Sequence, residues 1–244
     1  MNSAVIFSGP STHGIDAGAW PALTFAPPAE AGDVVRAVRQ GARVIGIVDG
    51  YFETTRSVWH KEILWALDRG VAVLGASSMG ALRAAELADF GMQGVGWVFE
   101  QYHSGILEDD DEVTLLHGPP ETGYMPLTEA LVNIRYGLSR AVADGAIGQA
   151  AGDAVLRAAK SLNYKERTFE NILENISKDS GDVLDYETFL DYKNKNDLDR
   201  KRDDASDMFA LMSEIVKRRG SVSVSFNLNM TEQLSGLLAE VGKG

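Results

Sequence analysis

Residues 71–90 have the sequence VAVLGASSMGALRAAELADF, and this stretch decides the fold. Its first four residues are all apolar, as in a strand that is buried on both faces. Gly75 to Gly80 are small residues apart from one methionine, which is typical of a turn. Met79 to Phe90 are rich in Ala and Leu, which predicts a helix, with Gly91 as its C′ residue. The stretch therefore predicts a strand, a turn and a helix in direct succession.

Similar strand and helix patterns precede this stretch, so we expect parallel strands joined by crossover helices. The upstream strands are predicted at residues 4–7, 23–26 and 43–48. The upstream helices are predicted at residues 33–40 and 57–69, the second with Ser57 as its N-cap. One more strand is predicted at Val113–Leu116.

The second half of the chain is predicted to be mainly helical. The expected helices cover residues 127–143, 149–161, 167–177 and 203–218, and a charged, poorly periodic stretch covers residues 178–202. The predicted fold is α/β, with a parallel-sheet N-terminal half and crossover helices, followed by a mainly helical C-terminal half. We expect residues 1–125 to form the α/β core that carries the site, and residues 126–244 to form a helical region packed on or appended to it.

Composition narrows the classes of function. The chain has 244 residues, a formal net charge of −12 and no cysteine. The negative charge disfavours binding to nucleic acid, and the lack of cysteine excludes disulfides, thiolate metal sites and cysteine nucleophiles. The first residues lack the pattern of a secretory signal, and no apolar run is long enough to span a membrane. We therefore expect a cytoplasmic protein that binds neither nucleic acid nor a membrane.

We expect the turn at Gly75–Gly80 to be the centre of the active site, and three interpretations of it compete. Its glycines have the spacing of a phosphate-binding loop, but Ala81-Leu82 stands where the loop needs Lys and Ser or Thr. Alternatively, the turn is a nucleophile elbow, because Ser78 has a small residue two positions before it and Gly80 two positions after it. Finally, Ser77 or Ser78 merely caps the following helix, which is the commoner role for serine.

A serine nucleophile needs a base, and Lys61 is the best candidate. The helix that carries Lys61 and the turn that carries the serines both follow strands, so both are expected at the carboxyl edge of the sheet, where open α/β sheets bind ligands. The positive end of a helix disfavours an ammonium group, which helps a lysine to act as a base. An ordinary surface lysine is the alternative. The residues expected to bind substrate or an oxyanion at the same edge are Ser8, Gly9, Met79, Gly80, His60, Asp49 and Arg83.

A run of five carboxylates covers residues 108–112. It lacks the alternating spacing and the glycine of an EF-hand loop, so a cation site is disfavoured. We expect a solvated acidic loop or a docking site for a basic partner.

Several segments, in order, resemble the TfuA-like family. The resemblance covers roughly residues 3–140 and is carried by residues 49–52, 58–64, 75–87, 90–92, 94–96, 110–113 and 133–135. Members of this family accompany YcaO enzymes, which replace a peptide backbone amide oxygen with sulfur. The resemblance implies a hydrolase that releases sulfide for YcaO from a thiocarboxylated ThiS-like carrier protein, and that helps to recruit the peptide substrate.

The resemblance also implies a Ser–Lys pair, and the matching positions are Lys61 and one serine of the turn. The elbow spacing favours Ser78 as the nucleophile, with Ser77 as the second choice. Attack on the thiocarboxylate would form an acyl-enzyme and expel sulfide, so we expect neither a cofactor nor a metal ion. The alternative is a non-catalytic adaptor that docks on YcaO and recruits its peptide substrate, in which the serine turn is only structural.

Overall fold

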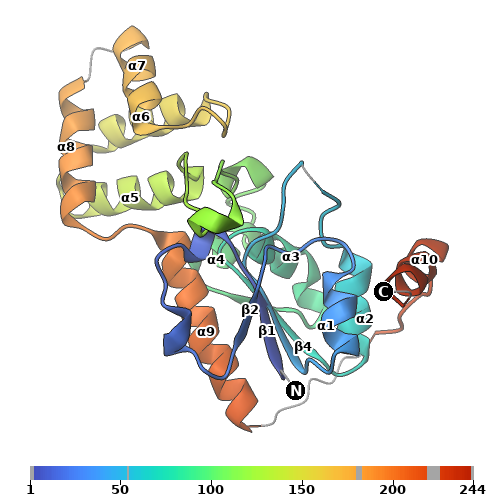
Figure 1. Cartoon of the computed structure of the whole chain (residues 1–244). Helices are drawn as coiled ribbons and strands as arrows, with labels where there is room; N and C mark the ends of the chain where they lie inside the picture. Colours follow the sequence, from blue (N-terminus) through green and yellow to red (C-terminus); the bar gives the residue numbers. More distant parts are fainter. Residues whose placement is uncertain (1–2, 54, 180–182, 219–225, 243–244) are drawn as a thin grey trace. The chain divides into compact units, whose positions relative to one another are not determined.

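A computed structural model describes residues 3–53, 55–179, 183–218 and 226–242 (Figure 1). The chain divides into two compact units. Unit 1 comprises residues 1–108 and 201–244, and unit 2 comprises residues 109–200. These units differ from the division expected at residue 125, because the last part of the chain packs with the first.

Unit 1 is built on a five-stranded parallel sheet with the strand order β2-β1-β3-β4-β5. The strands are β1 (Ala4–Phe7), β2 (Thr24–Ala26), β3 (Val44–Ile47), β4 (Ala72–Ala76) and β5 (Gln93–Val95). The strand order reverses direction between β1 and β3, so the carboxyl ends of these two strands form the topological switch point of the sheet. The prediction of a parallel α/β core followed by a mainly helical half is confirmed.

The fifth strand is not the one that the sequence predicted. Val113–Leu116 lies in no strand and follows the short 3-10 helix η4 (Asp110–Glu112), so that prediction was wrong. β5 has only three residues, and its central Gly94 has no side chain to signal a strand. A Cβ atom at Gly94 would lie 2.1 Å from the Phe99 ring, so glycine is needed there for tertiary packing.

Helices cover both faces of the sheet. α1 (Asp33–Arg39), α2 (His60–Asp68) and α3 (Met79–Leu87) share one hydrophobic cluster with β3, whereas α9 (Arg200–Arg218) packs on the opposite face through Met208, Phe209 and Met212 (Figure 1). The contact with α9 is close, since a Cβ atom at Gly46 would lie 2.5 Å from the sulfur of Met212.

The remaining elements of unit 1 are short, apart from the last helix. They are the 3-10 helices η1 (Pro10–Thr12), η2 (Ala17–Ala19) and η3 (Ala88–Phe90), together with α4 (Trp97–His103) and α10 (Glu232–Val241). α10 packs on α1 and α2, where its Leu234 and Leu237 bury Val35 and Trp65. The sequence analysis did not predict α10.

α2 begins later than expected. Its N-cap is Trp59 and not Ser57, because the buried Glu62 side chain accepts a hydrogen bond of 2.9 Å from the Trp59 backbone N–H. The same carboxylate accepts from the N–H of Gly32, at 3.0 and 3.1 Å, and so joins α2 to the start of α1. Lys61 therefore lies in the first turn of α2.

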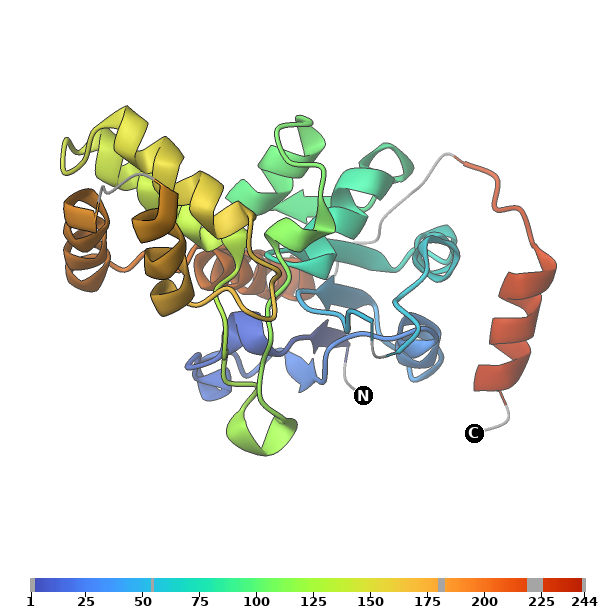
Figure 2. The ribbon, with the colours of Figure 1, turned by 90° about the horizontal axis from the view of Figure 1, so that it is seen from above.

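Unit 2 is helical. It contains η4, η5 (Pro120–Thr122), α5 (Leu131–Ala143), α6 (Gln149–Lys160), α7 (Phe169–Asp179) and α8 (Val183–Lys195), and its four α-helices pack around one core (Figure 2). α8 falls within the stretch that was expected to be poorly periodic, of which residues 180–182 lie outside the described part. Its buried Tyr186 and Phe189 anchor it in this core.

The end of the acidic run braces unit 2 through Asp111 and Glu112, whereas residues 108–110 are exposed, as expected for a solvated loop. Arg167, which is fully buried, donates to the Asp111 carboxylate at 2.6 Å and to the carbonyl oxygens of Ala159 and Leu162, each at 3.0 Å. Glu112 pairs with Arg135 at 2.7 Å, and Asp109 pairs with Lys160 at 3.0 Å. Across the described part of the chain, no helix is long and apolar enough to cross a membrane.

Candidate functional site

The turn between β4 and α3 has the backbone of a strained elbow. Ser77 follows β4 directly and has φ +71°, a left-handed conformation that costs a residue other than glycine about 1–3 kcal/mol. Ser78 is the N-cap of α3, but its side chain accepts no hydrogen bond from the helix. Neither serine therefore acts as a side-chain cap, and the strained position, which marks the nucleophile in an elbow, belongs to Ser77.

Two glycines make this tight turn feasible. A Cβ atom at Gly80 would lie 1.7 Å from the Ile47 carbonyl oxygen, and one at Gly75 would lie 2.0 Å from the Gly80 carbonyl oxygen. α3 therefore starts in direct backbone contact with β3 and β4, where a larger residue would not fit. The glycine spacing reflects this contact rather than a phosphate site.

The Ser77 hydroxyl is buried and has no hydrogen-bond partner among the described residues. A buried hydroxyl without a partner costs about 1–3 kcal/mol, and such groups are rare in native structures. The strain at the backbone and the unpaired hydroxyl thus fall on the same residue. Strain and an unpaired polar group of this kind are typical of positions retained for function.

The backbone N–H groups of the turn are mostly occupied. The N–H of Ser78 donates to the Ala76 carbonyl oxygen at 2.7 Å, and that of Gly80 donates to the Val48 carbonyl oxygen at 3.1 Å. Gly80 therefore does not offer the oxyanion donor that we expected from it. The N–H of Met79, in the first turn of α3, has no acceptor within the described part of the chain and can serve an oxyanion.

Lys61 is half-buried, and its ammonium group makes no hydrogen bond or ion pair with any described residue. Its helix follows β3 and that of the serines follows β4, so both start at the carboxyl edge of the sheet, as predicted. Neither serine hydroxyl is hydrogen-bonded to Lys61 in this structure. The Ser–Lys pair therefore stays a prediction.

His60 and Arg83 both contact the Glu86 carboxylate, which was not predicted from the sequence. His60 Nε2 lies 2.7 Å from Glu86 Oε2, and Arg83 Nη1 donates to the same oxygen at 2.8 Å. Arg83 Nε also donates to the Val58 carbonyl oxygen at 3.1 Å, which ties α3 to the start of α2. Partial burial alone would raise the pKa of Glu86, but the hydrogen bonds from His60 and Arg83 bring this pKa below its ordinary value.

Asp49 braces the switch point of the sheet through both oxygens of its carboxylate. Its carboxylate is buried and accepts from the N–H groups of Gly9 at 2.8 Å and of Ser11 at 3.1 Å, and from the Ser11 hydroxyl at 2.6 Å. Gly9 is therefore not available as the oxyanion donor that we expected. Ser8 is also buried, and its N–H donates to the Ala26 carbonyl oxygen at 3.0 Å.

Two pairs in this region were not predicted from the sequence: Ser11 with Asp49, and Glu86 with His60. Asp49 and Ser11 are 38 positions apart, and His60 and Glu86 are 26 apart. No local spacing signals either pair. Local spacing indicates only that Arg83 and Glu86, three positions apart, share one face of a helix, where they form an ion pair of 2.8 Å.

The fold and the turn define the class of this protein: a parallel α/β protein with a strained serine elbow at the end of a central strand. A family model described as TfuA-like protein matches residues 49–168, which include Lys61 and the whole turn. The match assigns the chain to the TfuA-like family and confirms that prediction. No curated protein matches the chain.

Proposed function

We propose that this chain hydrolyses the thiocarboxylate of a ThiS-like carrier protein and thereby releases sulfide for a YcaO enzyme that thioamidates peptide backbones. Membership of the TfuA-like family supports the part of this proposal that concerns peptide thioamidation by YcaO. The observation that carries the chemistry is Ser77, which combines a left-handed backbone with a buried, unpaired hydroxyl at the start of a helix. A helix that only needed a cap would not require such a residue.

The nucleophile that we propose is Ser77 rather than Ser78. The elbow spacing favoured Ser78, but an elbow is recognised by the strain on its central residue, and only Ser77 carries that strain within the turn. Ser78 keeps a conformation outside the left-handed region and is the second candidate. The N–H of Met79 is the donor that we assign to the developing oxyanion.

The reaction proceeds in two steps. The Ser77 Oγ attacks the thiocarboxylate carbon and forms a C–O bond, its proton passes to Lys61, and the tetrahedral intermediate then loses its C–S bond. The proton leaves with the sulfur as hydrosulfide, and the carrier remains attached through an ester. Water, activated by Lys61, then cleaves this ester to give the carrier carboxylate and to restore the serine, and the proton released with the carboxylate goes to the hydrosulfide. Overall one thiocarboxylate and one water give one carboxylate and one hydrogen sulfide.

Lys61 is suited to this role by its position and by its lack of partners. It lies in the first turn of α2, and no carboxylate among the described residues pairs with it. An unpaired lysine is free to turn toward a bound substrate. The neighbouring His60, whose Nε2 lies 2.7 Å from Glu86 Oε2, is the group that we assign to binding the carrier.

The proposal is tested by measuring sulfide release from a thiocarboxylated carrier. We expect Ser77→Ala and Lys61→Ala each to lower the rate at least about a hundredfold, since each removes a group needed for the chemical step. Ser104→Ala, at an exposed serine of unit 1, is the matched control and should keep the normal rate. If the Ser77, Ser78 and Lys61 variants all release sulfide normally, the Ser–Lys mechanism is wrong.

The second candidate function is a non-catalytic adaptor for YcaO. Two observations favour it: the Ser77 hydroxyl is closed off from solvent, and three large apolar side chains are exposed on one arm of unit 2. The arm is a hairpin in which the Leu127 N–H donates to the Leu116 carbonyl oxygen at 2.8 Å. Leu116, Met125 and Leu127 on it are 40%, 44% and 49% exposed. Exposed apolar groups of this kind mark surfaces for protein partners.

The adaptor function predicts a different result. The wild-type chain would release no sulfide, yet it would bind the YcaO enzyme, and Leu116→Ser combined with Leu127→Ser would weaken that binding. Under the hydrolase function, sulfide release by the isolated chain would survive these two substitutions.

A further inference from the structure

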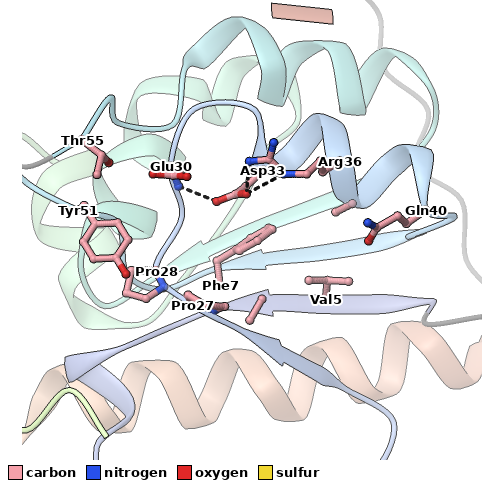
Figure 3. Close-up of a pocket in the computed structure, with 12 residues that line it drawn as sticks. Val5, Phe7, Pro27, Pro28, Glu30, Asp33, Arg36, Gln40, Tyr51 and Thr55 are labelled. Atoms are coloured by element: carbon pink, nitrogen blue, oxygen red, sulfur yellow. Dashed lines mark hydrogen bonds and ion pairs between the residues drawn. The ribbon is translucent and has the colours of Figure 1, made fainter. Parts of the chain in front are cut away.

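A cavity of about 490 Å³ lies on the sheet face that α1 covers, and none of the residues of the Gly75–Gly80 turn lines it (Figure 3). Its floor is formed by Val5 and Phe7 of β1 and by Ala26 of β2, and one wall is the face of α1. The loops after β2 and β3 close its other side. A volume of this size accommodates a small organic ligand or a long side chain.

The charges that line the cavity do not cancel. Asp33 accepts from Arg36 at 2.8 and 3.3 Å and from the Glu30 N–H at 2.9 Å, so the Arg36 charge is neutralised and the Asp33 carboxylate is occupied (Figure 3). The Glu30 carboxylate, in contrast, makes no hydrogen bond or ion pair with any described residue. The lining therefore keeps one uncompensated negative charge, on Glu30.

Beyond the Asp33–Arg36 pair, the groups near Glu30 are a tyrosine, a threonine and two prolines. Tyr51 and Thr55, from the loop after β3, lie at the same end of the cavity as Glu30, and Pro27 and Pro28 form the adjacent wall (Figure 3). A carboxylate beside an aromatic ring attracts organic cations, because the ring face and the carboxylate are both negative. The apolar floor suits an aliphatic stem that leads to such a cation.

We propose that this cavity binds an alkylammonium or guanidinium group carried on an aliphatic stem, with the charge at Glu30 and Tyr51 and the stem along Phe7 and the prolines. The site is separate from the proposed hydrolase site and does not depend on it. The same chemistry is present in a free small amine and in a lysine or arginine side chain of a peptide.

The test is a titration of the full chain with four probes of similar size, followed by two-dimensional amide NMR. The probes are butylammonium, butylguanidinium, uncharged pentanol and pentanoate. We expect the two cations to bind with a Kd that is roughly millimolar or tighter and to shift the amide signals of Ala26 and of residues 29–40 and 51–53. The alcohol should bind at least about fivefold more weakly.

Matched variants locate the charge. Glu30→Gln should weaken binding of both cations about fivefold and leave the amide spectrum otherwise native, since it removes the unpaired charge alone. Tyr51→Leu should weaken it by a smaller factor. Glu100→Gln, at an exposed glutamate of α4, should have no effect. A capped tripeptide with a central lysine that binds better than butylammonium would identify a peptide side chain as the ligand, and weaker binding of the tripeptide would identify a free amine.

Two results would overturn the proposal. Pentanoate could bind as well as the cations, which would mean that Arg36 dominates the cavity. The cations could also bind Glu30→Gln as tightly as the wild type or shift signals elsewhere in the chain, which would mean that this cavity is not their site.

Discussion

Glu62 should make the stability of unit 1 depend on pH. Its carboxyl group is buried, and burial raises its pKa from 4.5 to about 7. The nearby negative charge of Asp33 also raises this pKa, whereas the hydrogen bonds from the N–H groups of Trp59 and Gly32 lower it. In the unfolded chain the group loses its proton near pH 4.5. Between pH 4.5 and about 7 the folded chain therefore holds a proton that the unfolded chain has released.

The sign and the size of the effect follow from this difference. Because unfolding releases a proton in this range, the free energy of unfolding falls as the pH rises. The contribution is fully present below pH 4.5 and is lost as the pH passes through about 7. At about 1.4 kcal/mol for each pH unit, the loss amounts to about 3 kcal/mol.

Glu62→Gln isolates this contribution. A glutamine oxygen in the place of Oε1 keeps the hydrogen bond from Trp59 and one of the two from Gly32. The amide nitrogen then takes the place of Oε2, where it faces the Gly32 N–H, but this cost does not depend on pH because the amide cannot ionise. The free energy of unfolding of the variant, relative to the wild type, should therefore rise by about 3 kcal/mol between pH 4.5 and pH 8.

The assay is urea unfolding at several pH values, followed by tryptophan fluorescence. All four tryptophans lie in unit 1, so the signal reports this unit alone. Glu100→Gln, on the exposed face of α4, should show a constant difference from the wild type over the same range. If the difference between Glu62→Gln and the wild type is also constant, the buried carboxyl is not neutral near pH 6 and the reasoning is refuted.

Three further substitutions test the turn and unit 2. Ser77→Gly should raise the free energy of unfolding by about 1 kcal/mol, because it relieves the left-handed backbone and removes the unpaired hydroxyl, and it should abolish sulfide release; denaturant unfolding and the sulfide assay measure the two effects. Gly80→Ala should lower the free energy of unfolding by more than about 3 kcal/mol, because its Cβ would lie 1.7 Å from the Ile47 carbonyl oxygen. The control Gly236→Ala, with open space around it in α10, should raise the free energy of unfolding by up to about 1 kcal/mol. If both substitutions are tolerated in denaturant unfolding, α3 is not in backbone contact with β3. Arg167→Met should destabilise unit 2 by about 3 kcal/mol, measured as faster amide hydrogen exchange in α6 and α7 with unchanged exchange in the sheet of unit 1.

Most of the sheet could be predicted because its strands are locally distinctive. β1, β3 and β4 are continuous apolar runs that end in glycine or polar turns, and such runs signal burial on both faces without reference to the rest of the chain. β5 was missed because Gln93-Gly94-Val95 carries no such pattern and is a strand only because β4 offers it an edge. α9 was predicted as a helix, but its place on the sheet depends on partners that are far away in the sequence.

In the candidate site, too, contacts with distant segments could not be predicted from the sequence. The turn itself, the serines and the start of the Lys61 helix could be placed at one sheet edge from strand order alone. The assignment of Gly9 and Gly80 as oxyanion donors failed because the acceptors of their N–H groups, Asp49 and Val48, come from other segments of the chain. A sequence shows which groups can donate, but it does not show which of them are already bonded.

The sequence by itself determined the parallel α/β core, the serine turn at the end of a central strand and the membership of the TfuA-like family. Each of these depends on residue type and short-range spacing, which the chain carries locally. Only the tertiary structure decided that Ser77, and not Ser78, bears the left-handed backbone, and that its hydroxyl has no partner within the described residues. The physical reason is that α3 is pressed against the backbone of β3 at Gly80, and this contact between distant segments sets the course of the turn.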